Sequence, residues 1–325
     1  MRRMMPLVYD TSESGHRARG VKLISQLVSG RVLIGPPWRL LARLVWHPGM
    51  LIWQTADYAI VPLTLIATLR TIFLRKTVAL CYRNDRGLVG KSLRSRVRRM
   101  LVWVISHFLK VNVVFIFPPR AGSPQTYPWI FDPEWWDLGV MPVADAHVAR
   151  LEGEGDVVLF IGNIDRLKGL DFFIEAAEEA ARFALPLRFV LVGPAEKLTP
   201  SQLNLLRAAG ATLLDALPTD SEFLAYLRRA QYLWCCYHPD YDQSSGIFGR
   251  SLQLGIPAIV RKGSLMDEFA AKFGNGVSVR FGDIPDLLQK LVQKPARSIS
   301  SATFVEEFRQ DSLMKLERLG TDGTR

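Results

Sequence analysis

The sequence predicts an α/β protein made of two doubly wound, Rossmann-like domains that face a central cleft. Short apolar runs, as expected for strands buried on both faces, alternate with segments whose apolar residues recur at helical spacing. The connections between them are short, which is typical of parallel sheets covered by helices. With 325 residues, 49% hydrophobic and 22% charged, the chain is long enough for two domains and too apolar to be disordered.

The N-terminal half, residues 1–145, is predicted to form the first domain, although its alternation is the less regular one. Its longest helix is expected at about residues 91–110. The stretch 118–145 is rich in Pro, Trp and Gly, so we interpret it as the crossing between the domains. Strands are expected at 6–9, 32–34, 58–61, 77–82 and 113–117.

The C-terminal domain, residues 146–300, shows the clearer alternation. Asp156–Gly162 is a continuous apolar run ending in Gly, and Leu170–Phe183 follows with an amphipathic helical pattern. Residues 301–325 are predicted to form a helix that packs back toward the N-terminal domain. The remaining strands are expected at 188–193, near 213, and at 232–237, 257–260 and 277–280, and the remaining helices at 200–209, 221–229, 246–254, around 266 and at 284–292.

Composition excludes several classes of protein. Three cysteines, two of them adjacent, form no disulfide framework, which favours a reducing compartment. The five histidines are scattered and show no metal-ligand spacing. The most apolar windows, 59–74 and 100–117, are interrupted by polar residues and are too short to span a bilayer, and the N-terminus lacks the apolar core of a signal peptide. We therefore expect a cytoplasmic protein.

The segment that follows the first strand of the C-terminal domain has the composition of an anion site. Gly162 stands at the strand exit, where the absence of a side chain lets a ligand approach the backbone. Lys168 lies just before a helix start, where free N–H groups and the helix dipole already favour negative charge. The alternative is an ordinary capped turn whose lysine points to solvent.

A second polar segment, YHPDYDQSSGIFGRSLQLGIPAIV at Tyr237–Val260, also leads into a helix. Ser244, Ser245 and Gly246 are candidates for its N-cap and first turn. The alternative is again a simple polar cap. Since ligands bind beyond the carboxyl ends of strands in such sheets, the two segments together predict a phosphate or diphosphate site.

These motifs resemble those of the retaining GT-B glycosyltransferases of the family-4 type. The resemblance covers roughly residues 156–292 and rests on FIGNIDRLKGLDFFIEAA, FVLVGPA and GIPAI. It implies that the C-terminal domain binds a nucleotide-diphosphate sugar, UDP- or GDP-linked, and that the N-terminal domain holds the acceptor. It also implies a metal-independent reaction that uses no cofactor.

Carried over position by position, the resemblance assigns a donor site. Lys168 falls on the lysine that contacts the donor diphosphate; the arginine beside it in the family is replaced by Asn163, with Arg166 close by. The family's pair of acids falls on Asp242 and Arg250, so the ribose contact of the family cannot be the usual one. Arg250 could bind phosphate as a fork or pair with Asp242. The assigned donor-binding residues are Gly162, Asn163, Arg166, Lys168, Gly193, Asp242, Ser244, Ser245, Gly246 and Arg250.

The acceptor side is assigned to the loops after the first and fourth strands of the N-terminal domain. Gly15, His16 and Arg17 resemble the family's acceptor-side loop, and His16 is either a catalyst or a helix cap. Where the family often has a histidine, this chain has Asp85 nearby, which could orient or deprotonate an acceptor hydroxyl or could serve as a turn residue. The predicted catalytic residues are therefore Asp85, His16 and Lys168.

Charge is unevenly distributed between the halves. Residues 1–150 hold 21 Lys or Arg against 8 Asp or Glu, whereas residues 151–325 hold 20 against 23. The helix at 91–110 begins with a basic cluster, and we predict that it rests on an anionic membrane with tryptophans near the headgroups. A packed helix with a solvated basic end is one alternative and nucleic-acid binding is another, but no nucleic-acid motif is present and the aromatic residues lie among aliphatic ones. The tryptophans are Trp38, Trp46, Trp53 and Trp103, and the stripe assigned to the core is Leu93, Val97, Met100, Leu101, Val104 and Phe108.

The predicted function is transfer of a sugar to a lipid-linked or polysaccharide-precursor acceptor at the inner face of the membrane. A non-catalytic GT-B subunit that binds or scaffolds within a polysaccharide assembly system is the main alternative, favoured by Arg250 and by the missing histidine. A sugar-nucleotide epimerase would need two adjacent carboxylates in the cleft, and the sequence offers no such pair.

Overall fold

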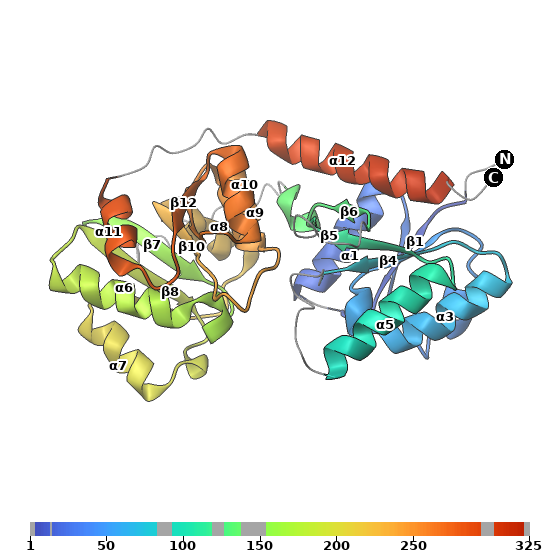
Figure 1. Ribbon diagram of the computed structural model, residues 1–325, viewed down its shortest axis with the longest axis horizontal. Coiled ribbons are helices and arrows are strands. Elements are labelled where there is room, and N and C mark those ends of the chain that lie inside the picture. The colour runs from blue at the N-terminus through green and yellow to red at the C-terminus, as the bar shows by residue number, and fades with distance from the viewer. Residues whose placement is uncertain are drawn as a thin grey trace. The chain divides into compact units, whose positions relative to one another are not determined.

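The computed structural model describes residues 4–13, 15–82, 93–118, 127–137, 154–293 and 302–321. The chain divides into two compact units (Figure 1). Unit 1 consists of residues 1–137 and 305–325, and unit 2 consists of residues 138–304. Every strand pairing within the described residues is parallel, which confirms the predicted α/β class.

Unit 1 is built on a six-stranded sheet with the order β2-β1-β3-β4-β5-β6. Its central strands are buried along their whole length, as expected for a sheet covered on both faces. The strands are β1 (Leu7–Asp10), β2 (Arg31–Ile34), β3 (Leu51–Trp53), β4 (Thr77–Cys81), β5 (Asn112–Ile116) and β6 (Trp129–Ile130). The helices are α1 (Gly15–Leu27), α2 (Leu41–Trp46), η1 (Ala56–Tyr58), α3 (Ile60–Ile72), α5 (Leu93–His107), η2 (Pro133–Trp135) and α12 (Ala302–Thr321).

The strand predicted at residues 58–61 is wrong. The third strand is β3, seven residues earlier, and the apolar segment from Ile60 forms helix α3. The thirteen residues of α3 are mostly apolar and bury one face through Leu63, Ile66 and Ala67. Pro62 is tolerated because it lies in the first turn, whose N–H groups have no partner within the helix. The interpretation of 118–145 as a crossing is also wrong in part, because β6 and η2 belong to unit 1.

Arg70 holds the amino ends of the unit 1 strands together from within the core. Its side chain is fully buried, and all five of its N–H donors are used. It donates to the carbonyl oxygens of Leu44, His47, Gly49 and Lys76 at 2.7–3.0 Å and to Thr77 Oγ1 at 3.1 Å. Burial and the neighbouring Arg75 lower the pKa of Arg70 to about 10, so the guanidinium is still charged at neutral pH.

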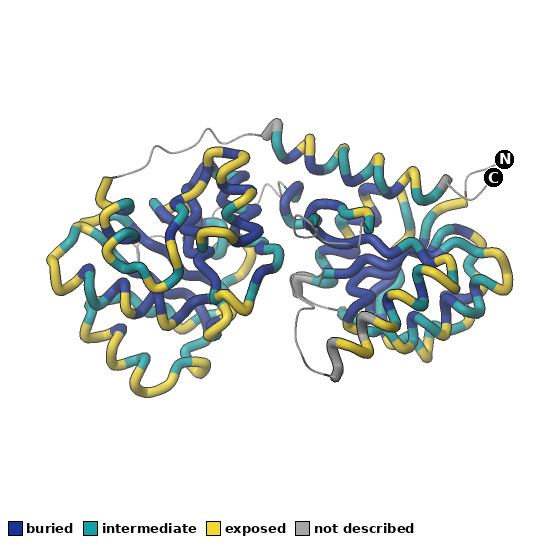
Figure 2. The backbone as a smooth tube through the Cα atoms, viewed as in Figure 1, coloured by how far each residue is buried: buried dark blue, intermediate teal, exposed yellow. Residues whose placement is uncertain are grey.

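Helix α12 follows unit 2 in the sequence but packs on unit 1. Phe308 lies against Phe131, with ring centroids 4.3 Å apart, and Ser312 Oγ accepts a hydrogen bond from the Phe131 backbone N–H at 3.2 Å. Near the end of the helix, Lys76 Nζ donates to the Gly320 carbonyl at 2.5 Å. Burial along the helix therefore alternates between a face on unit 1 and an exposed face (Figure 2).

Unit 2 carries a second six-stranded sheet with the order β12-β11-β10-β7-β8-β9. Its elements lie close to the expected positions, because each helix buries one apolar stripe, as α6 does with Phe172 and Phe173. The strands are β7 (Asp156–Ile161), β8 (Leu187–Gly193), β9 (Thr212–Asp215), β10 (Tyr232–Cys235), β11 (Ala258–Arg261) and β12 (Gly276–Val279). The helices are η4 (Arg166–Lys168), α6 (Leu170–Arg182), η5 (Ala195–Lys197), α7 (Pro200–Ala208), α8 (Asp220–Arg229), α9 (Gly246–Leu254), α10 (Leu265–Phe273) and α11 (Ile284–Val292).

The order of this second sheet determines where a ligand can bind. β7 and β10 are neighbours, and from them the chain order runs outward in opposite directions. Such a topological switch point leaves a crevice at the carboxyl ends of the two central strands. The loops that follow β7 and β10 are the two polar segments that the sequence singles out. Within the described residues, no helix combines the length and hydropathy needed to cross a membrane.

Candidate functional site

The loops after β7 and β10 are in direct backbone contact. The Trp234 indole N–H donates to the Lys168 carbonyl at 3.2 Å, and the His238 N–H donates to the Leu167 carbonyl at 3.1 Å. Gly169 lies between them with a φ of 77°, and a Cβ there would overlap the carbonyl oxygen of Cys236. The two loops therefore pack directly against each other, and the short distance between their backbones requires a glycine at position 169.

Lys168 is held over two tyrosine rings. Its Nζ lies 4.2 Å from the ring centroid of Tyr237 and 4.6 Å from that of Tyr241, and 3.4 Å from the Tyr241 hydroxyl. Asp165 caps the backbone of the same turn, because its carboxylate accepts from the Lys168 N–H at 3.0 Å. Lys168 forms no ion pair with a described carboxylate, so its charge is oriented by aromatic faces and is left uncompensated.

Ser245 begins helix α9 and connects it to this lysine. Its buried hydroxyl accepts from the Phe248 N–H at 3.2 Å as the N-cap, and it shares a hydrogen bond of 2.7 Å with the Tyr237 hydroxyl. Tyr237 thus contacts Lys168 through its ring and Ser245 through its hydroxyl. The ammonium group and the positive end of α9 converge on one side chain.

Burial sets the protonation of this centre. It raises the pKa of Tyr237 well above its ordinary value, so the phenol is neutral at physiological pH. Burial also raises the pKa of the Cys235 thiol to about 12, and it raises that of Cys236 as well. Neither cysteine is therefore a thiolate nucleophile near neutral pH.

The two strand-exit glycines differ in role. Gly162 has a φ of 110°, and a Cβ built on it meets no atom within 4 Å, so the backbone faces open space. A Cβ on Gly193 would lie 2.5 Å from the Gly162 carbonyl oxygen and 2.9 Å from the Ile164 side chain. Gly193 therefore allows the ends of β7 and β8 to pack closely, whereas Gly162 leaves room for an approaching group.

Asn163 and Arg166, also assigned to the donor, are engaged within the loop pair. Asn163 Nδ2 donates to Asp165 Oδ2 at 2.8 Å. Arg166 lies 3.2 Å from His238 Nε2 and 3.6 Å from the Asp240 carboxylate, and its side chain is 61% exposed. Arg166 therefore contacts the exposed start of the second loop and takes no part in the contacts that hold Lys168.

Asp242 and Arg250, the positions of the family's acidic pair, are both engaged elsewhere in unit 2. Asp242 is buried, and its carboxylate accepts from the Leu265 N–H at the start of α10 at 2.7 Å and lies 3.8 Å from Arg261. Arg250 donates to Gln253 on its own helix at 2.7 Å. Asp242 therefore anchors α10 to the second loop, a structural role that the sequence assignment did not include.

The loop after β1, to which the sequence assigns the acceptor, is organised by a buried carboxylate at the end of that strand. Asp10 accepts hydrogen bonds from Arg17 at 2.5 Å, from the Ser12 N–H at 2.8 Å and from the Thr55 hydroxyl. Arg17 therefore lies at the carboxyl end of this strand, and its acceptor-binding role stays a prediction. Gly15 and His16 are placed only as the first residues of α1, and Asp85 lies outside the described residues.

The sequence missed a polar cluster next to this loop. Gln54 is fully buried after β3 and donates to the Tyr82 hydroxyl at 3.0 Å, while Asp57 accepts from the Tyr82 N–H at 3.2 Å. Burial raises the pKa of Tyr82 well above its ordinary value, and the nearby Asp132 raises it further. Among the described residues, the Gln54 side-chain oxygen has no hydrogen-bond partner. The misplaced third strand concealed this cluster, because Gln54 follows the true strand directly.

Comparison with known proteins gives a result at the level of the fold. No protein-family model matches the chain, and no curated protein sequence does. Among solved structures, HepE from Anabaena in complex with UDP and glucose aligns with a TM-score of 0.66 at 14% identity, covering 97% of this chain and 99% of that one. Sucrose-phosphate synthase from Thermosynechococcus elongatus aligns at 0.58, with 12% identity and 98% and 96% coverage.

A third similar structure is the UDP-forming α,α-trehalose-phosphate synthase from Burkholderia vietnamiensis. It aligns at a TM-score of 0.56 with 11% identity, covering 98% of this chain and 96% of that one. The chain has the GT-B fold. At these identities the comparison establishes the GT-B architecture over nearly the whole chain, as the motifs after β7 and β10 predicted.

Replacing Gly169 with alanine should lower the free energy of unfolding by at least about 2 kcal/mol, because the methyl group meets the Cys236 carbonyl and the φ is unfavourable. Gly210→Ala is the matched control, since Gly210 has a φ of 67° and open space around the Cβ. It should cost only about 1 kcal/mol, the penalty of the backbone conformation. Urea unfolding of both variants measures the difference, and equal losses would show that the two loops are not closely packed.

Proposed function

We propose that the chain is a glycosyltransferase that takes a sugar from a nucleotide-diphosphate donor bound by unit 2 and passes it to an acceptor bound by unit 1. The observation that carries this proposal is the convergence of Lys168 and the start of α9 on Tyr237. An uncompensated ammonium and the positive end of a helix dipole together suit a diphosphate. The GT-B fold supports the assignment, and the similar structures include one solved with UDP and glucose.

In the proposed reaction the bond between the anomeric carbon and the diphosphate oxygen breaks as the acceptor oxygen bonds to that carbon, and the acceptor hydroxyl gives its proton to a base, for which Asp85 and His16 are the proposed candidates. Negative charge grows on the leaving oxygen, and a cation already fixed in place stabilises it most. Lys168 and the N–H groups at Ser245 and Gly246 supply that positive charge, so the step needs no metal ion. Retention of configuration, as in the family-4 enzymes, is part of the proposal.

The site differs from that of the family-4 type enzymes at the position expected to contact the donor ribose, where this chain has Arg250 instead of an acidic residue. A carboxylate accepts hydrogen bonds from ribose hydroxyls, whereas a guanidinium can only donate. The proposed donor is therefore held mainly through its diphosphate, with Lys168 as the central contact. A non-catalytic subunit that binds a sugar nucleotide within a polysaccharide assembly system is the second candidate, favoured by the same substitution.

Calorimetric titration with UDP and GDP, followed by assays of UDP- and GDP-sugar hydrolysis, tests the donor site. Saturable nucleotide binding with release of the sugar is expected, because water substitutes slowly for the acceptor. Binding without any turnover, also in the presence of extracted lipid-linked acceptors, would favour the non-catalytic subunit. Absence of binding to both nucleotides would exclude both candidates.

We further propose that the acceptor is lipid-linked or a polysaccharide precursor and that unit 1 approaches it at the inner surface of the membrane. Helices α3 and α5 lie side by side on one face of the sheet (Figure 1). Their exposed residues include Val61, Leu65 and Ile72 on α3 and Met100 and Trp103 on α5, and neither helix contains an acidic residue. An acid-free surface with exposed apolar side chains suits an anionic membrane.

Two details of the expected membrane face are corrected by the structure. Trp53, expected near the headgroups, is fully buried against Tyr9 in the core. On α5, Val97 and Met100, which the spacing assigned to the core, are 43% and 55% exposed, while Ile105 is buried. The helix is thus rotated relative to the expected stripe, and part of its apolar side chains face outward. Phe108, just beyond the helix, is exposed as well.

A further inference from the structure

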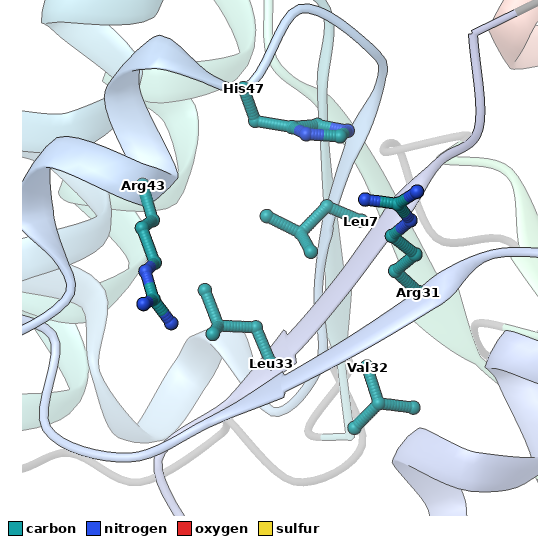
Figure 3. Close-up of a pocket in the computed structure, with 6 residues that line it drawn as sticks. All are labelled: Leu7, Arg31, Val32, Leu33, Arg43 and His47. Atoms are coloured by element: carbon teal, nitrogen blue, oxygen red, sulfur yellow. The ribbon is translucent and has the colours of Figure 1, made fainter.

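A basic pocket lies at the outer edge of the unit 1 sheet, away from the acceptor loop (Figure 3). It encloses about 410 Å³, and His47 and the two arginines surround an apolar floor. Leu7 and Arg31 are the first residues of β1 and β2, so the pocket opens at the amino ends of these strands. The polar groups after β1, β3 and β4 lie at the other end of the strands, their carboxyl ends. The lining residues are Leu7, Arg31, Val32, Leu33, Arg43 and His47.

The pocket carries positive charge without a described counter-ion. Arg31 and Arg43 are exposed, and neither forms an ion pair with a described carboxylate. The buried Arg70 donates to the carbonyl of His47, a residue of the pocket, and among the described residues its hydrogen-bond partners are carbonyl and hydroxyl oxygens. Asp57 is the sole acidic residue between positions 15 and 82, and it lies beyond the carboxyl ends of the strands. A bound anion would compensate this charge.

His47 completes the pocket as a neutral side chain. Its Nε2 lies 3.0 Å from the Met5 carbonyl oxygen, which can only accept, so this nitrogen carries the ring proton. Burial lowers the pKa of His47, and the charges of Arg70, Arg31 and Arg75 lower it further, although the Met5 carbonyl opposes the shift. The positive charge of the pocket therefore comes from its arginines.

The surface beside the pocket is apolar and aromatic. Trp46, next to His47 in the chain, packs on Phe73 with ring centroids 4.5 Å apart, and Arg75 lies over both rings. Trp46 and Phe73 are 55% and 42% exposed. Leu74, which follows Phe73, is 94% exposed. Cationic and aromatic side chains of this kind are typical of a membrane interface, where one end is apolar and the other is wet.

Leu74 occupies a position that stability alone would give to glycine. It follows the end of α3 with a φ of 53°, and hydrogen bonds from the Arg75 N–H to the Arg70 carbonyl and from the Leu74 N–H to the Thr71 carbonyl close the turn. Glycine is strongly preferred at such a left-handed helix end. A leucine here is both unfavourable in backbone conformation and nearly fully exposed to water, so insertion into an apolar phase accounts for it.

We propose that this pocket binds the phosphate of an anionic phospholipid between Arg31 and Arg43, while Trp46, Phe73 and Leu74 enter the membrane interface. A free phosphate ion would satisfy the arginines but would leave the three apolar side chains in water. A phospholipid in a bilayer suits both parts of the surface, because its phosphate binds the arginines while the membrane interface takes up the apolar side chains. The inference rests on the proposed membrane association of unit 1, and it is independent of glycosyl transfer.

Co-sedimentation of the full chain with vesicles tests the proposal. Wild-type protein should bind vesicles of phosphatidylcholine and phosphatidylglycerol and bind pure phosphatidylcholine far more weakly. The double variant Arg31→Gln/Arg43→Gln should bind the anionic vesicles at least about tenfold more weakly, since each basic residue near a charged bilayer contributes severalfold. The matched control, Arg228→Gln/Arg229→Gln, removes the same charge from exposed positions on unit 2 and should bind like the wild type.

Leu74→Gly separates a docking role from a structural one. It should raise the melting temperature, because glycine suits the left-handed turn, and it should weaken vesicle binding severalfold. A purely structural leucine would leave vesicle binding unchanged, which would contradict the proposal.

Three outcomes would overturn the assignment. If the double variant binds anionic vesicles like the wild type, the pocket is not the headgroup site. If it loses affinity for inorganic phosphate but keeps its affinity for vesicles, the pocket binds a free phosphate instead. If the wild type ignores anionic vesicles while still binding nucleotide, the membrane association fails and the donor site of unit 2 stands.

Discussion

Turnover of the sugar nucleotide should fall at least about tenfold, and up to about a thousandfold, when Lys168 is replaced by alanine. The ammonium group lies over Tyr237 and Tyr241 at the junction of the two loops, and it forms no ion pair with a described carboxylate. In the proposed reaction it faces the leaving diphosphate, whose charge grows in the transition state. Its loss should therefore lower kcat and also weaken binding of UDP or GDP.

The fold should survive this substitution. Lys168 contributes two cation–π contacts, with Tyr237 and Tyr241, which are worth about 1 kcal/mol or less at a partly exposed site. Arg207→Ala, at an exposed position on α7, is the control for loss of a positive charge in unit 2. Steady-state kinetics and thermal melting of both variants provide the measurement. Wild-type transfer by Lys168→Ala would refute the donor site.

Replacing Arg70 with methionine should lower the free energy of unfolding by about 3–5 kcal/mol. The guanidinium donates to four carbonyl oxygens and one hydroxyl, all buried or partly buried, which link α2, the loop before β3 and the start of β4. Methionine fills most of the volume but removes all five of these hydrogen bonds, and of the four carbonyls only that of Lys76 keeps another donor among the described residues, the Leu51 N–H. Lysine would restore three donors at most and should recover only part of the loss.

Arg43→Met provides the control for this second experiment. Arg43 is exposed and forms no ion pair with a described carboxylate, so its replacement should change the unfolding free energy by less than about 0.5 kcal/mol. Urea denaturation followed by circular dichroism compares the two variants. Similar stabilities for Arg70→Met and Arg43→Met would show that the buried hydrogen bonds contribute little.

The predicted fold is confirmed most fully in unit 2, and the reason lies in local physics. Buried parallel strands need continuous apolar runs, and their helices need one apolar stripe, so both signals are visible in a single sequence. In unit 1 the same rules placed a strand at 58–61, because an apolar helix start and a buried strand look alike over four residues. The polar cluster around Gln54 was missed for this reason.

The candidate donor site could be predicted only in part. Lys168 and Ser245 stood out because each lies between a strand exit and a helix start. Tyr237 did not, because its role depends on a ring contact with one loop and a hydroxyl contact with the helix of another. Asp242 was assigned by position to the donor, yet its buried carboxylate binds the start of α10.

By itself the sequence determined the alternation of strands and helices, the glycines at the strand exits and the lysine before α6, since each depends on neighbours along the chain. Only the tertiary structure decided which side chain joins the two loops, which face of α5 is exposed, and that Arg31 and Arg43 share a pocket with His47. These depend on strand order and helix rotation, which arise from packing between segments distant in sequence and leave no local pattern.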